Sequence, residues 1–266
     1  MWVTTSDVDE FLAVAGPSLR ARPVENTLLL TIADAVRTRG RHVYGDRAPV
    51  FGWHTAGAAF VWTPPRPLLL SAADDDAAAA LADTLDATVP AVNSTEPAAR
   101  AFSAAWCRRT GATVTPGRRS RLYRLEELAK PDVVGAARVA DPGDRDLLVA
   151  WLTAFSDEIG EPPHGLAESV DARLAHGALT LWEADSAPVA VAGFNGPAGG
   201  VVRVGPVYTP PSARRHGYGS AVTAAVSAAA RPHEVVLFTD LANPTSNSIY
   251  TKLGYRPVED RLILAF

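Results

Sequence analysis

The alternation of hydrophobic and polar positions in the second half of the chain predicts a mixture of helices and strands. An amphipathic helix is predicted from Arg145 to Phe155, because Leu148, Leu152 and Phe155 fall on one helix face. The same reasoning predicts helices at Leu166–His176, Tyr218–Ala230 and Pro244–Leu253, and strands at Ala178–Ala184, Val189–Asn195, Val201–Tyr208, Glu234–Thr239 and Arg261–Phe266. Because helices and strands do not alternate strictly, we expect an α/β sheet of mixed direction.

The first half repeats a weaker version of this pattern. It predicts helices at Asp7–Ala15, Asn26–Thr38, Asp74–Leu85 and Glu96–Thr110, and strands at Val50–Trp53, Ala58–Trp62, Leu68–Ser71 and Arg121–Leu125. Its last part, Val92–Val114, aligns with Leu241–Val258, since in both an Asn precedes a helix that ends in Gly and a strand follows. We interpret the halves as divergent copies of one fold; the alternative is two unrelated α/β units.

A polar segment with a proline, Glu126–Asp132, separates the two halves. Asp141 and Pro142 then provide an N-cap and a first helical residue for a new unit. A chain of 266 residues is long enough for two ordinary domains. We therefore predict one domain over residues 1–130 and a second over residues 131–266.

The net charge of each half indicates which classes of binding partner are expected. The chain has a net charge of −4, divided into +1 for residues 1–130 (15 basic, 14 acidic) and −5 for residues 131–266 (10 basic, 15 acidic). Neither half has the basic excess typical of nucleic-acid binding, so we expect no nucleic-acid partner. An acidic second half would suit a cationic substrate, although ordinary solubility explains it equally well.

Composition also bears on the compartment. No apolar run approaches the roughly 18–20 residues that span a bilayer, and the N-terminal residues lack the pattern of a signal peptide. Cys107 is the single cysteine, so no disulfide forms within the chain and no cysteine cluster can bind zinc. We expect a cytoplasmic protein without a membrane partner or a bound metal, as a monomer or a homodimer.

A basic, glycine-rich stretch, "ARRHGYGSA" (Ala213–Ala221), joins a predicted strand to a predicted helix. A helix N-terminus exposes unpaired N–H groups and the positive end of the helix dipole, and glycines let an anion approach them. Arginine side chains beside the loop match phosphate oxygens. The stretch therefore predicts an anion site, whereas the plainer interpretation is a turn that uses glycine for positive φ.

Two neighbouring features strengthen the anion site. Pro206 lacks an N–H and fits poorly inside a paired strand, so we expect a bulge or an edge there, with free backbone groups for an extended ligand. Asn243 and Pro244 start a later helix, on which Asn247 and Tyr250 lie three residues apart on one face.

The stretches "VGPVYTPPSARRHGYGSAV" and "NPTSNSIYTKLGYRPV" together resemble the GCN5-related N-acetyltransferases (GNAT). The resemblance covers residues 133–266 well and residues 1–130 only through the faint repeat. It implies a mixed, largely antiparallel sheet flanked by helices, splayed between its fourth and fifth strands and present in two tandem domains. It also implies acetyl-CoA as co-substrate and the primary amine of a small molecule as acceptor. The first half lacks the Arg-x-x-Gly-x-Gly pattern, so we expect it to have lost CoA binding and to complete the acceptor pocket or stabilise the enzyme.

The resemblance also implies roles for individual residues. The residues that would hold acetyl-CoA are Val207, Tyr208, Arg214, Arg215, His216, Gly217, Tyr218, Gly219, Ser220 and Asn247. The N–H of Val207 or Tyr208 would polarise the thioester carbonyl, and Tyr250 would protonate the leaving thiolate; the alternative for Tyr250 is a packed tyrosine with a solvated hydroxyl.

The catalytic base is less clearly marked. We name Asp240 and Glu158 as candidates, with Asp157, Glu161 and His164 as further possibilities. The competing interpretations are a turn residue for Asp240, a solvated helix end for the acidic group and an exposed loop for His164. A protein N-terminal or lysine acetyltransferase, and a non-catalytic acyl-CoA-binding module, remain alternatives to the small-molecule enzyme.

Overall fold

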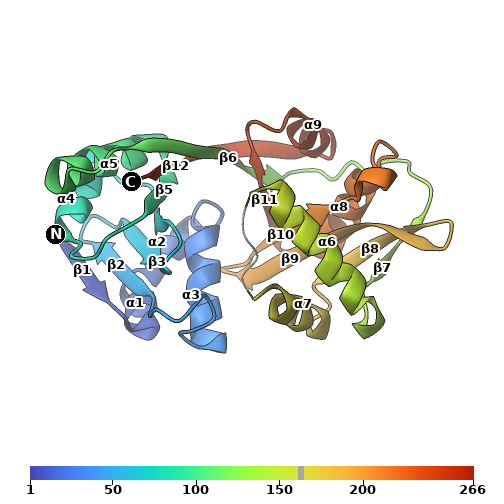
Figure 1. Cartoon of the computed structure of the whole chain (residues 1–266), viewed down its shortest axis with the longest axis horizontal. Coiled ribbons are helices and arrows are strands. Elements are labelled where there is room, and N and C mark those ends of the chain that lie inside the picture. Colours follow the sequence, from blue (N-terminus) through green and yellow to red (C-terminus); the bar gives the residue numbers. More distant parts are fainter. Residues whose placement is uncertain (161–164) are drawn as a thin grey trace.

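The computed structural model describes residues 1–160 and 165–266, which form two units with a similar order of elements (Figure 1). The first unit runs β1 (Trp2–Thr5), α1 (Val8–Val14), α2 (Gly16–Ala21), α3 (Thr27–Arg39), β2 (Val50–His54), β3 (Ala59–Trp62), β4 (Leu68–Leu70), α4 (Asp75–Thr84), β5 (Ala91–Thr95), α5 (Glu96–Thr110) and β6 (Thr115–Leu125). The second runs β7 (Ala136–Val139), α6 (Arg145–Glu158), α7 (Leu166–Ala175), β8 (Leu179–Ala184), β9 (Ala187–Ala198), β10 (Val201–Tyr208), α8 (Tyr218–Ala229), β11 (Glu234–Asp240), α9 (Pro244–Lys252) and β12 (Tyr255–Ala265).

The strands form one sheet in the order β1-β2-β3-β4-β5-β12-β6-β11-β10-β9-β8-β7. The order is the same when it is counted inward from either edge of the sheet, because β1 to β5 of the first unit correspond to β7 to β11 of the second. In each unit the fourth and fifth strands are parallel (β4 with β5, β10 with β11) and the other pairs are antiparallel. The mixed α/β sheet and its repetition, both predicted from the sequence, are confirmed.

The last strand of each unit lies in the sheet of the other unit. β6 pairs with β11 over Ser120–Arg124, and β12 pairs with β5 over Arg261–Ala265. β6 and β12 also pair with each other along most of their length, and the Arg121 guanidinium binds the Asp260 carboxylate there at 2.6 and 2.9 Å. Residues 255–266, predicted as part of the second domain, thus also close the sheet of the first.

Buried hydrophobic residues stabilise this exchange of β6 and β12 between the two units. Leu262 and Leu264 of β12 pack into the core of the first unit with Trp62 and Phe102, and all four are buried. Tyr123 and Leu125 of β6 are likewise buried in the core of the second unit. Since each core is completed by a strand from the other unit, we expect the two units to unfold together.

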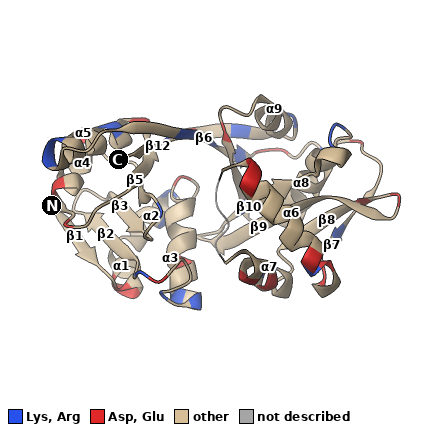
Figure 2. Ribbon diagram, in the orientation of Figure 1, with Lys and Arg blue, Asp and Glu red and all other residues tan. Residues whose placement is uncertain are grey.

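Charged residues of both signs are interspersed over the two units, and basic residues recur along β6 (Figure 2). No helix within the described ranges has the length and apolar character needed to cross a membrane.

A buried ion pair lies where β12 enters the first unit. Arg261 is 2% exposed; its Nη1 donates to Glu259 Oε1 at 3.0 Å, and its Nη2 donates to the carbonyl of Leu70 at 2.7 Å. Its Nε donates to Asn93 Oδ1 at 3.0 Å. Burial lowers the pKa of Arg261 and raises that of Glu259, while their mutual attraction opposes both shifts. The arginine therefore ties β12 to β4 and β5.

Arg261→Ala is expected to destabilise the whole protein by about 3–5 kcal/mol, because it leaves the largely buried Glu259 carboxylate without its positive partner. The measurement is urea unfolding followed by circular dichroism and tryptophan fluorescence, which should report one shared transition. Arg145→Ala is the control, since the Arg145–Asp171 pair is exposed and its loss should change little. Equal midpoints for the two variants would contradict this account.

Candidate functional site

The sheet of the second unit opens between β10 and β11. The two strands are paired over Val201–Val204 and Glu234–Leu237, after which β10 continues to Tyr208 beside β9 alone and β11 continues to Asp240 beside β6 alone. The register of β10 against β9 shifts between Val204 and Val207, where Gly205 has φ +147° and Pro206 lacks an N–H. The irregularity predicted at Pro206 is confirmed.

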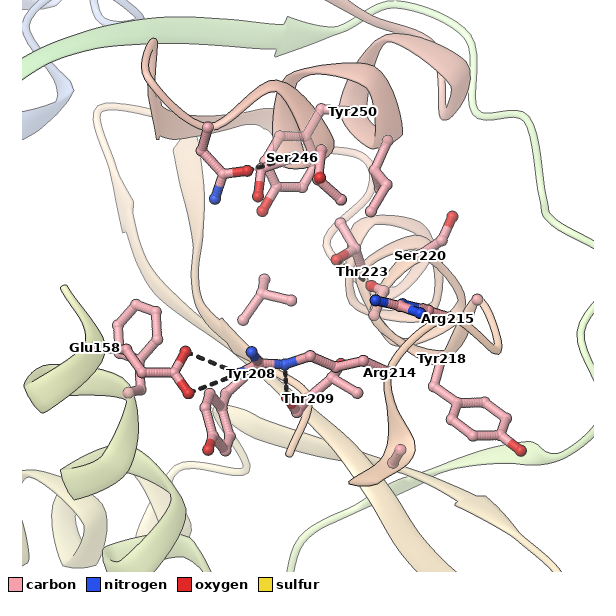
Figure 3. A pocket seen from close by; sticks show the side chains of 18 of the residues that line it. Glu158, Tyr208, Thr209, Arg214, Arg215, Tyr218, Ser220, Thr223, Ser246 and Tyr250 are labelled. Atoms are coloured by element: carbon pink, nitrogen blue, oxygen red, sulfur yellow. Dashed lines mark hydrogen bonds and ion pairs between the residues drawn. The ribbon is translucent and has the colours of Figure 1, made fainter. Parts of the chain in front are cut away.

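A cavity of about 590 Å³ lies at this opening (Figure 3). Its lining comes from the C-terminal end of α6, the end of β10, the loop before α8, and the first turns of α8 and α9. The lining residues that carry polar or titratable side chains include Glu158, Tyr208, Thr209, Arg214, Arg215, Tyr218, Ser220, Thr223, Ser246 and Tyr250.

Helix α8 begins at the cavity with unpaired backbone N–H groups. Gly217, its N-cap, has φ +82° and supplies no side-chain cap. The first intrahelical bond runs from the N–H of Ala221 to the carbonyl of Gly217, so the N–H groups of Tyr218, Gly219 and Ser220 have no helical acceptor. These N–H groups and the helix dipole favour a negative charge at the cavity wall.

The arginines before α8 differ in their contacts. Arg214 Nη2 donates to both oxygens of Glu158 at 2.7 and 2.8 Å, and its Nε donates to the carbonyl of Thr209 at 2.9 Å. This ion pair links the end of α6 to the loop across the cavity (Figure 3). Arg215 has φ +70° and no ion pair with the described carboxylates, so its charge is available to a ligand.

Tyr250 extends from α9 into the same cavity and packs edge-on against Tyr255, with ring centroids 6.1 Å apart. Burial raises the pKa of Tyr250 to about 12. The phenol is therefore protonated at neutral pH and can donate a proton or a hydrogen bond into the cavity.

Comparison with known proteins bears on this arrangement. The family model described as FR47-like protein matches residues 189–263, which contain β10, the loop, α8 and α9. An acetyltransferase of the GNAT family from Colwellia psychrerythraea superposes with a TM-score of 0.62 at 11% identity, over 100% of this chain and 98% of that chain. A GCN5-related N-acetyltransferase from Sphaerobacter thermophilus gives a TM-score of 0.63 at 14% identity, over 99% and 94%.

The chain has the GNAT fold.

Two further comparisons extend this result. A Drosophila protein has the same fold, with a TM-score of 0.68 at 14% identity over 100% of this chain and 98% of that chain. A glucosamine N-acetyltransferase region of a fungal multi-domain β-N-acetylglucosaminidase gives a TM-score of 0.56 at 11% identity, over 99% of this chain and 38% of that chain. No protein with a curated description matches the chain in sequence.

Most of the residues predicted from the sequence to bind acetyl-CoA or to act in catalysis line the cavity of this GNAT fold. They are Glu158, Val207, Tyr208, Arg214, Arg215, Gly217, Tyr218, Gly219, Ser220 and Tyr250. His216 does not line the cavity and instead stacks on Tyr218, with ring centroids 5.4 Å apart. Asp157 belongs to α6 without lining the cavity, and Glu161 and His164 lie outside the described residues.

Asn247 and Asp240 are placed differently from the sequence expectation. Asn247 Nδ2 donates to the carbonyls of Asp240 and Asn243 at 2.8 and 2.7 Å, and its Oδ1 accepts from the Tyr123 hydroxyl at 2.9 Å. Asp240 Oδ1 accepts from the N–H of Ala242 at 2.8 Å. Neither residue lines the cavity, because both hold the turn between β11 and α9.

Sequence reasoning missed Thr223, which lines the cavity one turn beyond Gly219. Its Oγ1 donates to the Gly219 carbonyl at 2.7 Å, and the i,i+4 spacing from a glycine of the loop is the signal that could have found it. Within the described residues no group of three or more His, Cys, Asp or Glu side chains is arranged to hold a metal ion.

The first unit has a smaller cavity at the corresponding place, of about 380 Å³, beside the N-terminus of α4. There Asp74 Oδ1 accepts from the N–H of Ala77 at 2.7 Å, and Asp75 and Asp76 add negative charge in the first turn. Carboxylates thus occupy the position where α8 leaves its N–H groups unpaired, and they repel a phosphate. This arrangement supports the interpretation of the first unit as a copy without an anion site.

Ser220→Glu is expected to weaken CoA binding by about 10²-fold, because it places a carboxylate at the first turn of α8 as Asp74 does at α4. Isothermal titration with CoA measures this change. Ser248→Glu makes the same substitution on the exposed face of α9 and should leave binding nearly unchanged. Similar affinities for both variants would place the anion site elsewhere.

Proposed function

We propose that the protein is an N-acetyltransferase that transfers the acetyl group of acetyl-CoA to a primary amine of a small molecule. The observation that carries the proposal is one cavity that contains unpaired N–H groups of α8, a free edge of β10 and the protonated Tyr250.

The residues of the cavity fit acetyl-CoA. The N–H groups of Tyr218, Gly219 and Ser220, with Arg215, would hold its pyrophosphate. A β-carbon on Gly219 would lie 3.1 Å from Thr209 Oγ1, so a side chain here would narrow the loop. The edge of β10 at Val207 and Tyr208, which has no partner on the β11 side, would pair with the extended pantetheine arm.

Acetyl-CoA supplies an activated acetyl group as a thioester. In the proposed reaction the amine nitrogen forms a bond to the carbonyl carbon and the carbon–sulfur bond breaks. The N–H of Val207 or Tyr208 stabilises the oxyanion, and Tyr250 gives its proton to the departing thiolate.

The amine must lose a proton as it is acylated. Glu158 is the one carboxylate among the described residues that line the cavity, so we assign it the acceptance of this proton, directly or through water. Its contact with Arg214 fixes its orientation toward the end of β10. Asp240, held in its turn, is not part of this proposal.

The proposal is tested by measuring acetyl-CoA consumption over a panel of amines, amino acids, amino sugars and peptides. Amino sugars are included because the similar fungal region is a glucosamine N-acetyltransferase. Turnover with a small amine supports the proposal, and turnover with peptides alone would indicate a protein acetyltransferase. Tight acetyl-CoA binding without turnover would indicate a non-catalytic acyl-CoA-binding module, and no binding at millimolar concentration would refute all three.

Tyr250→Phe is expected to lower kcat by about 10²-fold while leaving the affinity for acetyl-CoA unchanged, because it removes only the proton donor. Tyr218→Phe is the matched control, since Tyr218 lines the cavity but stacks on His216 outside it. Steady-state kinetics and titration calorimetry separate the two effects. Equal kcat values for the two variants would argue against Tyr250 as the acid.

The raised pKa of Tyr250 also predicts a pH profile. A phenol with a pKa of about 12 loses its proton only as the pH rises through that value, so its acid form is fully present at pH 7–10. We expect no alkaline loss of kcat below pH 10 in the wild-type enzyme. A descending limb near pH 8–9 that disappears in Tyr250→Phe would contradict this assignment.

A further inference from the structure

A cluster of arginines lies at the junction of the two units, around the phenol of Tyr44. Helix α3 of the first unit packs on β9 here, since Ala198 shares a hydrophobic cluster with Leu29 and Leu30 (Figure 1). The first unit contributes Tyr44, Arg39 and Arg66, and the second contributes Arg173 from α7 and Arg203 from β10.

Arg203 is the least satisfied of these residues. Its Nη1 is buried and has no hydrogen-bond partner, and burial lowers the pKa of the guanidinium. The buried Arg261, by contrast, has a carboxylate, an amide oxygen and two carbonyls around it. Since a buried guanidinium without a counter-ion is destabilising, Arg203 is not explained by folding alone.

Arg173 has neutral partners only. Its Nη1 donates to the carbonyl of Gly205 at 3.2 Å, and its Nη2 donates to Asn195 Oδ1 at 3.0 Å. Burial, together with the charges of Arg203 and Arg39, lowers its pKa to about 10. A β-carbon at Gly193 would lie 2.8 Å from Arg173 Nη1, so β9 leaves room for this guanidinium.

Tyr44 lies among these positive charges. The Arg66 guanidinium lies 5.5 Å from the centre of the Tyr44 ring and donates to the Tyr44 carbonyl, which holds the residue in place. Burial raises the pKa of the phenol, and the charges of Arg39, Arg203, Arg66 and Arg173 oppose this shift. Within the described part of the chain, none of the four arginines forms an ion pair with a carboxylate.

The cluster lies next to the opening of the sheet. Arg173 contacts the carbonyl of Gly205, and Val207, two residues further along β10, lines the cavity. Arg203 precedes Gly205 by two residues on the same strand, and its cross-strand partner Asn195 accepts a hydrogen bond from Arg173 Nη2, so the two guanidinium groups lie close together. The arginine cluster and the cavity are therefore connected through residues 203–207 of β10.

We propose that the acceptor is an amine that also carries an anionic oxygen group, a carboxylate or a phosphate, and that Arg203, Arg173 and Arg39 bind this group beside Tyr44. Guanidinium groups pair with both oxyanions through parallel hydrogen bonds, and desolvation strengthens such pairs. The inference rests on the proposed acetyltransferase function. It gives the first unit a part in recognising the acceptor.

The test compares matched acceptors that differ in this group alone. Glycine and lysine are measured beside their α-carboxamides, and glucosamine 6-phosphate beside glucosamine, by acetyl-CoA consumption. The member of each pair that carries the anionic group should be favoured by about 10²-fold in kcat/KM, because the analogue without that group leaves the arginines unpaired. A preference among amino acids identifies a carboxylate, and a preference for the sugar phosphate identifies a phosphate.

Arg203→Met should abolish this preference by raising KM for the charged acceptor, while acetyl-CoA affinity is unchanged. Its Tm should not fall, since the substitution removes an unpaired buried charge. Arg39→Ala provides a second variant at an exposed position, where misfolding is not expected. Arg37→Met on the same helix is the control, because Arg37 is exposed and paired with Asp34 at 2.9 Å.

The outcomes separate this inference from the proposed function. If amines are acetylated with no advantage for the charged members, or if Arg203→Met keeps the advantage, the inference is wrong and the acetyltransferase stands. If no amine is acetylated, binding is measured directly as the Tm shift caused by glutamate and by inorganic phosphate with CoA present. A shift that Arg203→Met removes supports the anion site without the enzyme, and no shift with either anion refutes it.

Discussion

The pairing of β12 with β5, and of β6 with β11, is the interaction on which the rest of the structure depends. Without these pairs the fifth strand of each unit would be an open edge, and each core would lose the apolar residues that the other unit supplies. The exchange turns two repeats into one continuous sheet, with Arg261 buried where β12 enters the first unit. It also explains why the first unit is retained beside a second unit that carries the cavity proposed for acetyl-CoA.

The two units use the same sheet in different ways. In the second, β10 separates from β11 at Gly205 and Pro206, and α8 begins without a side-chain cap, so backbone groups are left for a ligand. In the first, Asp74 caps α4 and satisfies the corresponding helix terminus. The first unit instead provides Tyr44 and two arginines to the junction near Gly205. In the proposed function, the donor is bound by the second unit and the acceptor is recognised between the two units.

Much of this could be predicted from the sequence, where local patterns decide the structure. The limits of β10 and of α5 agree with the prediction to the residue, and the glycine loop lies at the helix start where it was expected. The hydrophobic pattern did not predict β1, α2, β5 or β7. In β5 the polar residue Ser94 interrupts the pattern, although its side chain is buried and its hydroxyl donates to the carbonyls of Leu70 and Ser71. The exchange of β6 and β12 could not be predicted from local patterns, because the strands that pair with β12 lie more than a hundred residues earlier in the chain. The contact of the Asn247 amide with Tyr123, more than a hundred residues earlier, could not be predicted for the same reason.

The most direct measurement of the central claim is a crystal structure of the protein with CoA bound. The account predicts one CoA per chain, with its pyrophosphate on the N–H groups of Tyr218, Gly219 and Ser220 and its sulfur facing Tyr250. It also predicts no CoA at Asp74 in the first unit. A pyrophosphate bound at the N-terminus of α4, or a coenzyme outside the opening between β10 and β11, would contradict it.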